Sequence, residues 1–248
     1  MGSGRAAHHP GQRLTRPRPA AGGGRQLRVP PERLGRWLDG VAARHGTFDT
    51  VEPVDGAVRV VCADTTEVLL RAPFDWRPGP AAQSPPTPPV LSSFSAAVRV
   101  PHRAAVLLVR RGRWAVGVFD GAELVVSKVD ARQVQGRTAA GGWSQQRFAR
   151  RRANQTDAVV GAAVETAVRV LLPHAGEVEA LFTGGDRGLV DDVLADPRLR
   201  ALAALRRGPA LEVGDPTKAV LLETPSQFRA VDVHIVEPGD RATPSPRS

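Results

Sequence analysis

Two adjacent glycines and two glutamines form the part of this sequence best suited to chemistry. They lie in the run 135–147, which reads Gln-Gly-Arg-Thr-Ala-Ala-Gly-Gly-Trp-Ser-Gln-Gln-Arg. Gly141 and Gly142 free the backbone for conformations that other residues avoid. The side-chain amides of Gln145 and Gln146 provide neutral hydrogen-bond donors and acceptors. We therefore expect a loop that enters a confined, phosphate-rich place and presents an amide there.

Positive charge surrounds this run. Between Lys128 and Arg152 the sequence has seven basic residues and one acid, Asp130, which gives a local net charge of +6. The seven are Lys128, Arg132, Arg137, Arg147, Arg150, Arg151 and Arg152. The whole chain carries +9. A solvated charged face usually mixes both signs, so we expect these seven residues to bind RNA phosphates.

The elements that must position the run are three strands before it and a long helix after it. The strands are expected at 104–110, 113–119 and 122–129, with Asp120-Gly121 as a hairpin turn. The helix is expected at 155–172, where apolar residues recur at helical spacing and Thr156 can cap its start.

Strands and helices then alternate along the rest of the chain. We expect a strand at 178–182, helical stretches at 187–195 and 197–206, a short strand near 210–213, a helix from Asp215 to Leu222 and a last strand at 229–236. This order predicts an α/β (α+β overall) fold with a ribonuclease-H-like mixed sheet.

The sequence divides into five expected segments. Residues 1–26 are expected to be a disordered basic tail, 28–74 a small helix-plus-strands unit and 75–97 a proline-rich linker. Residues 98–237 would form the main α/β domain, and 238–248 a second disordered tail. Cys62, the single cysteine, lies in an apolar run and is expected in a core.

Other chemistries find little support in the residues. A two-metal nuclease needs carboxylates near the first strand, and 104–110 contains none. Ser144 lacks the second glycine of a nucleophile elbow, because position 146 is glutamine. The glycine-rich turn at 183–188 could contact phosphate, but an ordinary tight turn is the better interpretation. We expect no metal site, no cofactor, no membrane span and a cytoplasmic location.

Here the sequence resembles a known family. The pattern Gly-Gly-x-Ser-Gln at 141–145, with the arginine-rich stretch, Asn154 and the helix that follow, is similar to the catalytic loop of the eukaryotic-release-factor-like peptidyl-tRNA hydrolases. The fuller run 135–152 resembles their actinobacterial branch, the Vms-type ribosome quality-control release factors. Termination factors carry a contiguous Gly-Gly-Gln, whereas here Trp143 and Ser144 intervene.

The resemblance implies a fold, an activity and partners. The fold would be the ribonuclease-H-like catalytic domain of class-1 release factors without a metal site. The activity would be ribosome-dependent peptidyl-tRNA hydrolysis that releases stalled nascent chains, with the large ribosomal subunit, peptidyl-tRNA and rRNA as partners of a monomer. Gln145, Gly142 and Gly141 would be catalytic, with Gln145 favoured over Gln146 by motif position.

Two other functions stay open at this stage. A non-catalytic ribosome- or RNA-binding module would use the loop only as an anchor. A tRNA endonuclease would shorten the tRNA instead of freeing its peptide.

Overall fold

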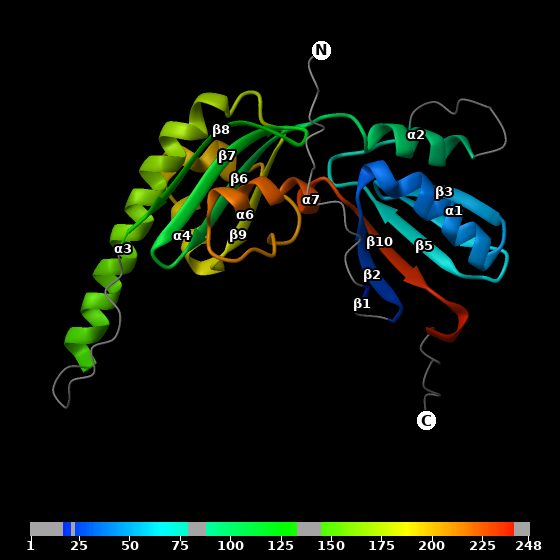
Figure 1. Ribbon diagram of the computed structural model, residues 1–248, viewed down its shortest axis with the longest axis horizontal. Coiled ribbons are helices and arrows are strands. Elements are labelled where there is room, and N and C mark those ends of the chain that lie inside the picture. Colours follow the sequence, from blue (N-terminus) through cyan, green and yellow to red (C-terminus); the bar gives the residue numbers. More distant parts are fainter. Residues whose placement is uncertain (1–16, 21–22, 79–87, 133–144, 241–248) are drawn as a thin grey trace, which may run out of the picture. The chain divides into compact units, whose positions relative to one another are not determined.

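The computed structural model describes residues 17–20, 23–78, 88–132 and 145–240, with only the helical backbone for 145–155. The chain folds into two compact units (Figure 1). Unit 1 comprises Met1–Val100 and Arg229–Ser248, and unit 2 comprises Pro101–Phe228. No helix in the described part of the chain combines the length and apolar composition needed to cross a membrane.

Unit 2 is built on a four-stranded mixed sheet of order β8-β7-β6-β9. Its strands are β6 (Arg103–Arg110), β7 (Arg113–Asp120), β8 (Glu123–Ala131) and β9 (Ala180–Gly185). The first three pair antiparallel through tight turns, and β9 lies parallel to β6. Three hairpin-linked strands followed by a parallel crossover strand form the ribonuclease-H-like arrangement that the sequence predicts, so the predicted fold class is confirmed.

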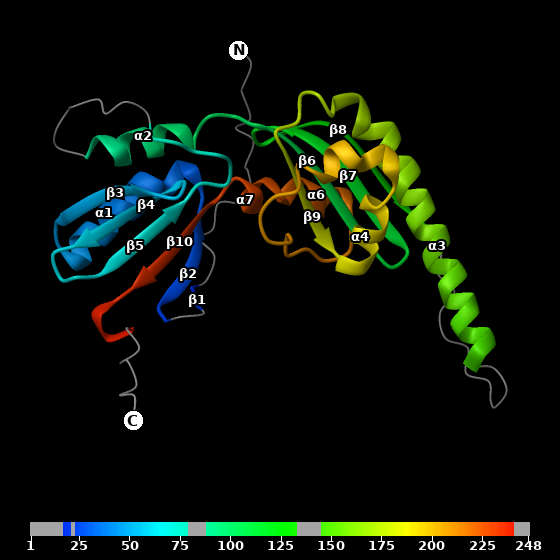
Figure 2. The same ribbon diagram turned by 180° about the vertical axis from the view of Figure 1, so that it is seen from behind.

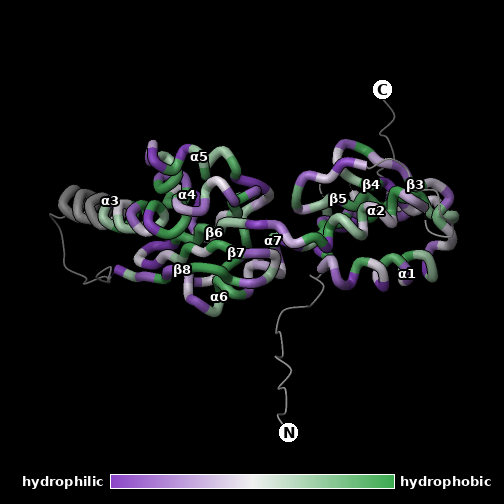
Figure 3. Tube along the Cα trace, turned by 90° about the horizontal axis from the view of Figure 1, so that it is seen from above, coloured by the Kyte–Doolittle hydropathy of each residue, from purple (hydrophilic) through white to green (hydrophobic). Residues whose placement is uncertain are grey.

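Helices cover both faces of this sheet. They are α3 (Gln145–Val170), α4 (Arg187–Leu194), α5 (Arg200–Ala203), α6 (Lys218–Glu223) and α7 (Pro225–Phe228), with 3-10 turns at Leu172–His174 and Pro197–Leu199. One face packs α3 and α4 against buried side chains such as Leu107 and Val116. On the other face, Gly117 makes room for Leu221 of α6. Figure 3 shows the hydrophobic residues concentrated along β6 and β7.

Unit 1 is built on a six-stranded antiparallel sheet of order β1-β2-β10-β5-β4-β3. The strands are β1 (Arg18–Pro19), β2 (Arg25–Val29), β3 (Phe48–Val54), β4 (Ala57–Cys62), β5 (Glu67–Arg71) and β10 (Val231–Val236). The helices α1 (Leu34–His45) and α2 (Pro89–Ala97) share one core with alternate residues of these strands. Short 3-10 turns lie at Pro31–Arg33 and Pro238–Asp240. Cys62 is buried in this core, as the sequence predicts.

The structure corrects the expected domain organisation in three places. The strand expected to close the 98–237 domain is β10, and it pairs instead with β2 and β5 of unit 1. Within the segment 75–97, expected to be a linker, Trp76, Leu91 and Phe94 are buried in the core of unit 1. Residues 18–19 and 25–26, expected in a disordered tail, belong to β1 and β2. The pairings of β10 with β2 and β5 are long-range, so no local pattern indicated them.

Local boundaries also differ from expectation. Helix α3 begins ten residues earlier than the expected start at 155, so Thr156 is not its cap. Thr217, rather than Asp215, caps α6 by accepting from the backbone N–H of Val220. Instead of a strand at 210–213 there is an isolated bridge from Leu211 to Gly184. Residues 183–185, expected in a turn, complete β9.

Candidate functional site

Helix α3 begins at Gln145, the last residue of the Gly-Gly-x-Ser-Gln pattern, and its second half fixes it to unit 2. Buried Val159, Ala163 and Ala167 recur at intervals of four residues and face the sheet. The periodicity that predicts an amphipathic helix therefore operates only from about residue 159 onward. The motif itself lies outside this packed half.

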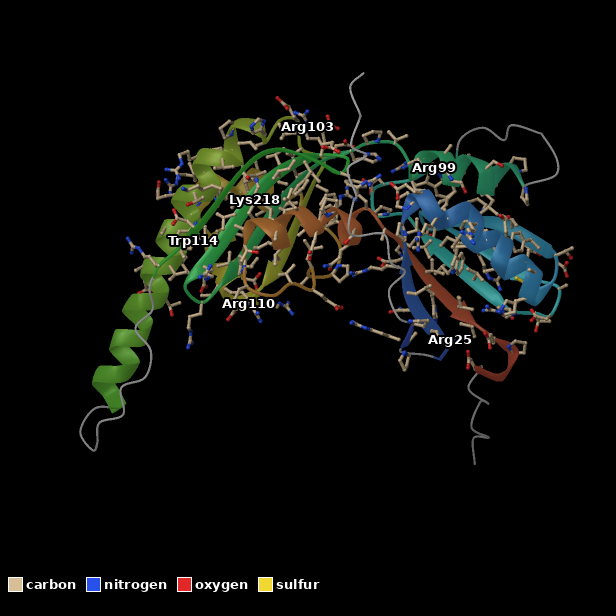
Figure 4. The ribbon with its side chains drawn as sticks, viewed as in Figure 1. Arg25, Arg99, Arg103, Arg110, Trp114 and Lys218 are labelled. Atoms are coloured by element: carbon tan, nitrogen blue, oxygen red, sulfur yellow. The ribbon has the colours of Figure 1, made fainter. Side chains whose placement is uncertain are left out.

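A buried hydrogen bond fixes the register of α3 on the sheet. The indole Nε1–H of Trp114 on β7 donates to Thr166 Oγ1 at 3.0 Å. The Thr166 hydroxyl in turn donates to the carbonyl of Ala162 at 2.8 Å. Both residues are about 3% exposed, so this pair is shielded from water. Trp114 is labelled in Figure 4. Trp114 lies in the strand expected at 113–119, but nothing local in the sequence indicates its polar partner.

A surface ion pair adds a second link. Arg198 donates to Glu165 of α3 at 2.8 Å and also binds Asp196. Its guanidinium hydrogen bond lowers the pKa of the Asp196 carboxyl below the ordinary value of 3.8. These groups are exposed, so the link positions α3 more than it stabilises it.

On the N-terminal side of the run 135–147, Arg132 follows β8 directly and is held by two hydrogen bonds. The backbone N–H of Arg132 donates to the carbonyl of Gly112 at 2.8 Å, which ties the end of β8 to the β6–β7 turn. The Arg132 guanidinium donates to the carbonyl of Ala158 on α3 at 3.3 Å. Arg132, expected to contact RNA, thus also joins β8 to α3.

This contact shows how far α3 extends beyond the sheet. Gln145 lies 13 residues before Ala158 in the same helix. At a rise of about 1.5 Å per residue, the helix runs roughly 20 Å past the Arg132 contact. Figures 1 and 2 show the first part of α3 continuing beyond the ends of the strands of unit 2. The structure thus places Gln145 at the far end of an extended helix.

The expected site residues fall into three groups. Lys128 lies on β8, half exposed, with its Nζ 3.8 Å from Asp130 Oδ2. Gln145 and the basic residues Arg147, Arg150, Arg151 and Arg152 occupy the first two turns or so of α3, where only the backbone is described. Gly141, Gly142 and Arg137 lie outside the described residues. Gln145, expected in a loop, is the first residue of the helix.

In the turn at 183–188, considered above as a phosphate contact, a side chain of the protein binds the backbone N–H groups at the start of α4. Asp186 caps α4, and its carboxylate accepts from the backbone N–H groups of Gly188 and Leu189. Gly185 has φ of +99°, and an added Cβ there would lie 2.1 Å from the carbonyl oxygen of Val109. A close approach of two strands, rather than a ligand, explains this glycine. Within the described ranges, no cluster of three or more His, Cys, Asp or Glu side chains could hold a metal ion.

Comparison with known proteins identifies the family. Residues 102–234 match the family described as the Actinobacteria/chloroflexi VLRF1 release factor, and they make up more than half of the chain. The chain belongs to the VLRF1 release-factor family. The family resemblance stated from the glutamine motif is therefore confirmed. The matched segment of this VLRF1 member includes all of unit 2 from residue 102 and continues into β10 of unit 1.

Several solved structures are similar to this VLRF1 family member at low sequence identity. A structure described as an archaeal protein shares 16% identity over 68% of this chain and 52% of its own, with a TM-score of 0.36. The archaeal translation termination factor aRF1 shares 15% over 82% and 66%, with a TM-score of 0.40. The Vms1 mitochondrial localization core shares 9% over 81% and 80%, with a TM-score of 0.41. The chain spans about half the length of the first of these. A search of curated proteins found no match.

Proposed function

We propose that the protein is a ribosome-dependent peptidyl-tRNA hydrolase that releases stalled nascent chains. The observation that carries this proposal is the position of Gln145 at the start of α3, about 20 Å along the helix from the contact between Arg132 and Ala158. A narrow extension of this length suits entry into a confined catalytic centre that the body of the protein could not reach. Membership of the VLRF1 release-factor family supports the same conclusion.

The reaction requires little from the protein beyond the correct positioning of a water molecule at the ester bond. The bond between a nascent peptide and the tRNA ribose is an activated ester, so orienting a water molecule against it supplies much of the rate. The side-chain amide of Gln145 would orient that water. The backbone N–H groups of the first helical turn have no partner within the helix, and one of them could stabilise the developing oxyanion. Gly141 and Gly142 would let the chain pass close to the substrate.

The basic residues would bind the surrounding RNA. Helical spacing puts positions 147, 150 and 151 on one side of α3, and position 152 follows directly. Together with Lys128, Arg132 and Arg137 they would neutralise rRNA or tRNA phosphates, a contribution that falls with rising salt. The contact from Arg132 to Ala158 uses only part of its guanidinium donors. We further propose that the protein acts as a cytoplasmic monomer on the large ribosomal subunit.

The test is peptide release from purified ribosomal complexes that carry labelled peptidyl-tRNA. The proposal predicts free peptide together with intact tRNA. Ribosome association without release would instead identify a binding module. A shortened tRNA on a gel would identify an endonuclease, and either of these results would overturn the proposal.

A further inference from the structure

Unit 1 contains a groove that the proposed chemistry does not use. It has a volume of about 780 Å³ and lies between α1 and the strands β2 and β10. Leu27 and Ile235 line it from the sheet, and so does Arg25, which is labelled in Figure 4. The wall on the other side is α1. Every residue that lines the groove belongs to unit 1.

The α1 wall has a specific pattern. Arg33, Trp37, Gly40 and Arg44 all line the groove, and their spacing of four, three and four residues places them on one side of the helix. The neighbouring side carries Leu34 and Leu38, which are buried in the core. The resulting alternation of hydrophilic and hydrophobic residues along α1 is visible in Figure 3.

The charge of the groove is positive and uncompensated. Its two acids already have partners, because Glu32 accepts from Arg229 at 2.8 Å and Glu237 pairs with Arg25. Three exposed arginines also line the groove, and none of their guanidinium groups forms an ion pair or hydrogen bond with the part of the chain that the structure describes. They are Arg33, Arg36 and Arg44. Because no acid of the described protein occupies them, these three guanidinium groups are available to an external anion.

Gly40 is a second feature of the groove, independent of its charge. A Cβ added at Gly40 would meet nothing within 4 Å, so no packing contact within the protein requires glycine there. Glycine in a helix interior costs about 1 kcal/mol relative to alanine. In return, it leaves the helix backbone open beside the indole of Trp37. Trp37 itself is half-buried, packed on the core and lining the groove.

We propose that this groove binds a single strand of RNA. Phosphates would bind Arg33, Arg36 and Arg44, and a base would stack on Trp37 over the space left by Gly40. Arg33 and Arg44 are about 16 Å apart along the helix axis, which is long enough for a short run of nucleotides. Planar guanidinium groups next to an aromatic ring are the combination that sequence-tolerant single-strand binding uses. An acidic peptide would use the charges but would not need the ring.

This inference does not depend on hydrolase activity, and it is tested by binding. The probe is a fluorescein-labelled single-stranded RNA of mixed sequence, titrated with the full chain at several salt concentrations. The variant Arg33→Gln with Arg44→Gln is compared with the control Arg71→Gln with Arg77→Gln. The control removes the same charge from exposed arginines of unit 1 that do not line the groove. We expect the groove variant to lower the slope of log K against log salt by about 1.4, because each single-strand phosphate contact contributes about 0.7.

The aromatic and glycine positions are tested with the same probe. We expect Trp37→Ala to weaken binding roughly 5- to 150-fold, and Trp37→Phe to keep most of the affinity because a ring remains. Gly40→Gln should block the groove while the fold stays intact, and Gly161→Gln in α3 is its control, since a Cβ there also meets nothing within 4 Å. Equal affinities for the groove variants and their controls would overturn the proposal. So would a poly-glutamate probe that competes fully while Trp37→Ala has no effect.

Discussion

The substitution Thr166→Val tests how α3 is held on unit 2. Valine keeps the shape and β-branching of threonine but has no hydroxyl. The carbonyl of Ala162 keeps its bond within the helix, so it loses little. The group left without a partner is the indole N–H of Trp114, which now donates to Thr166 at 3.0 Å.

The magnitude follows from burial. Trp114 and Thr166 are each about 3% exposed, so water does not replace the lost acceptor. A buried donor left unsatisfied costs about 1–3 kcal/mol. The equilibrium constant for unfolding of unit 2 should therefore rise roughly 5- to 150-fold at 25 °C. Removing the donor instead, with Trp114→Phe, leaves the threonine hydroxyl bonded to Ala162 and creates mainly a packing loss.

The assay is chemical denaturation of both single variants and the double variant, with hydrogen exchange of the α3 amides as a local readout. The double-variant cycle should give a coupling energy of about 0.5–1.5 kcal/mol between the two positions. Faster exchange should appear from residue 159 onward, where the helix is packed. Loss of less than about 0.5 kcal/mol in Thr166→Val, with zero coupling, would refute the reasoning.

Two further predictions concern stability. Gly185→Ala should lower the free energy of unfolding by about 2 kcal/mol or more in denaturant titrations, because φ is +99° and the new Cβ would lie 2.1 Å from the carbonyl oxygen of Val109. The control Gly161→Ala, at an open helical position, should instead stabilise the protein slightly. Equal effects of the two substitutions would contradict this explanation. The hydrogen bond from His45 lowers the pKa of the Asp64 carboxyl below its ordinary value of 3.8. A carboxyl whose pKa is lowered by folding stabilises the protein above that ordinary value, and this contribution is lost as pH falls through the lowered pKa. Stability of Asp64→Asn should therefore fall less steeply than wild type in acid titrations below about pH 4, and parallel profiles would rule this out.

Short-range patterns predicted most of unit 2. Asp120-Gly121 correctly marked the turn between β7 and β8, where Gly121 adopts a positive φ of +57°. The helix start was placed ten residues late because residues 145–155 have no apolar stripe. Their glutamine, arginine and alanine content favours helix by propensity alone.

Local sequence patterns do not predict which strands pair over long distances in the chain. The strand at 231–236 was expected, but alternation within a strand does not identify its neighbours, and β10 pairs with β2 and β5, each more than 150 residues away in sequence. The helix α2 had a readable signal, since Pro89 opens it and Leu91 and Phe94 share its buried side. The surrounding prolines favoured a linker instead. The glycines of the motif lie outside the described residues, so their role stays a prediction.

The most direct test of the central claim compares Gln145→Ala with Gln146→Ala in single-turnover release from ribosome-bound peptidyl-tRNA. The two variants remove the same amide from adjacent positions of α3, so helix propensity and charge change equally. We predict that Gln145→Ala lowers the release rate roughly 10²- to 10³-fold, the scale of one preorganised donor, while Gln146→Ala stays close to wild type. Unchanged release in Gln145→Ala would contradict the account.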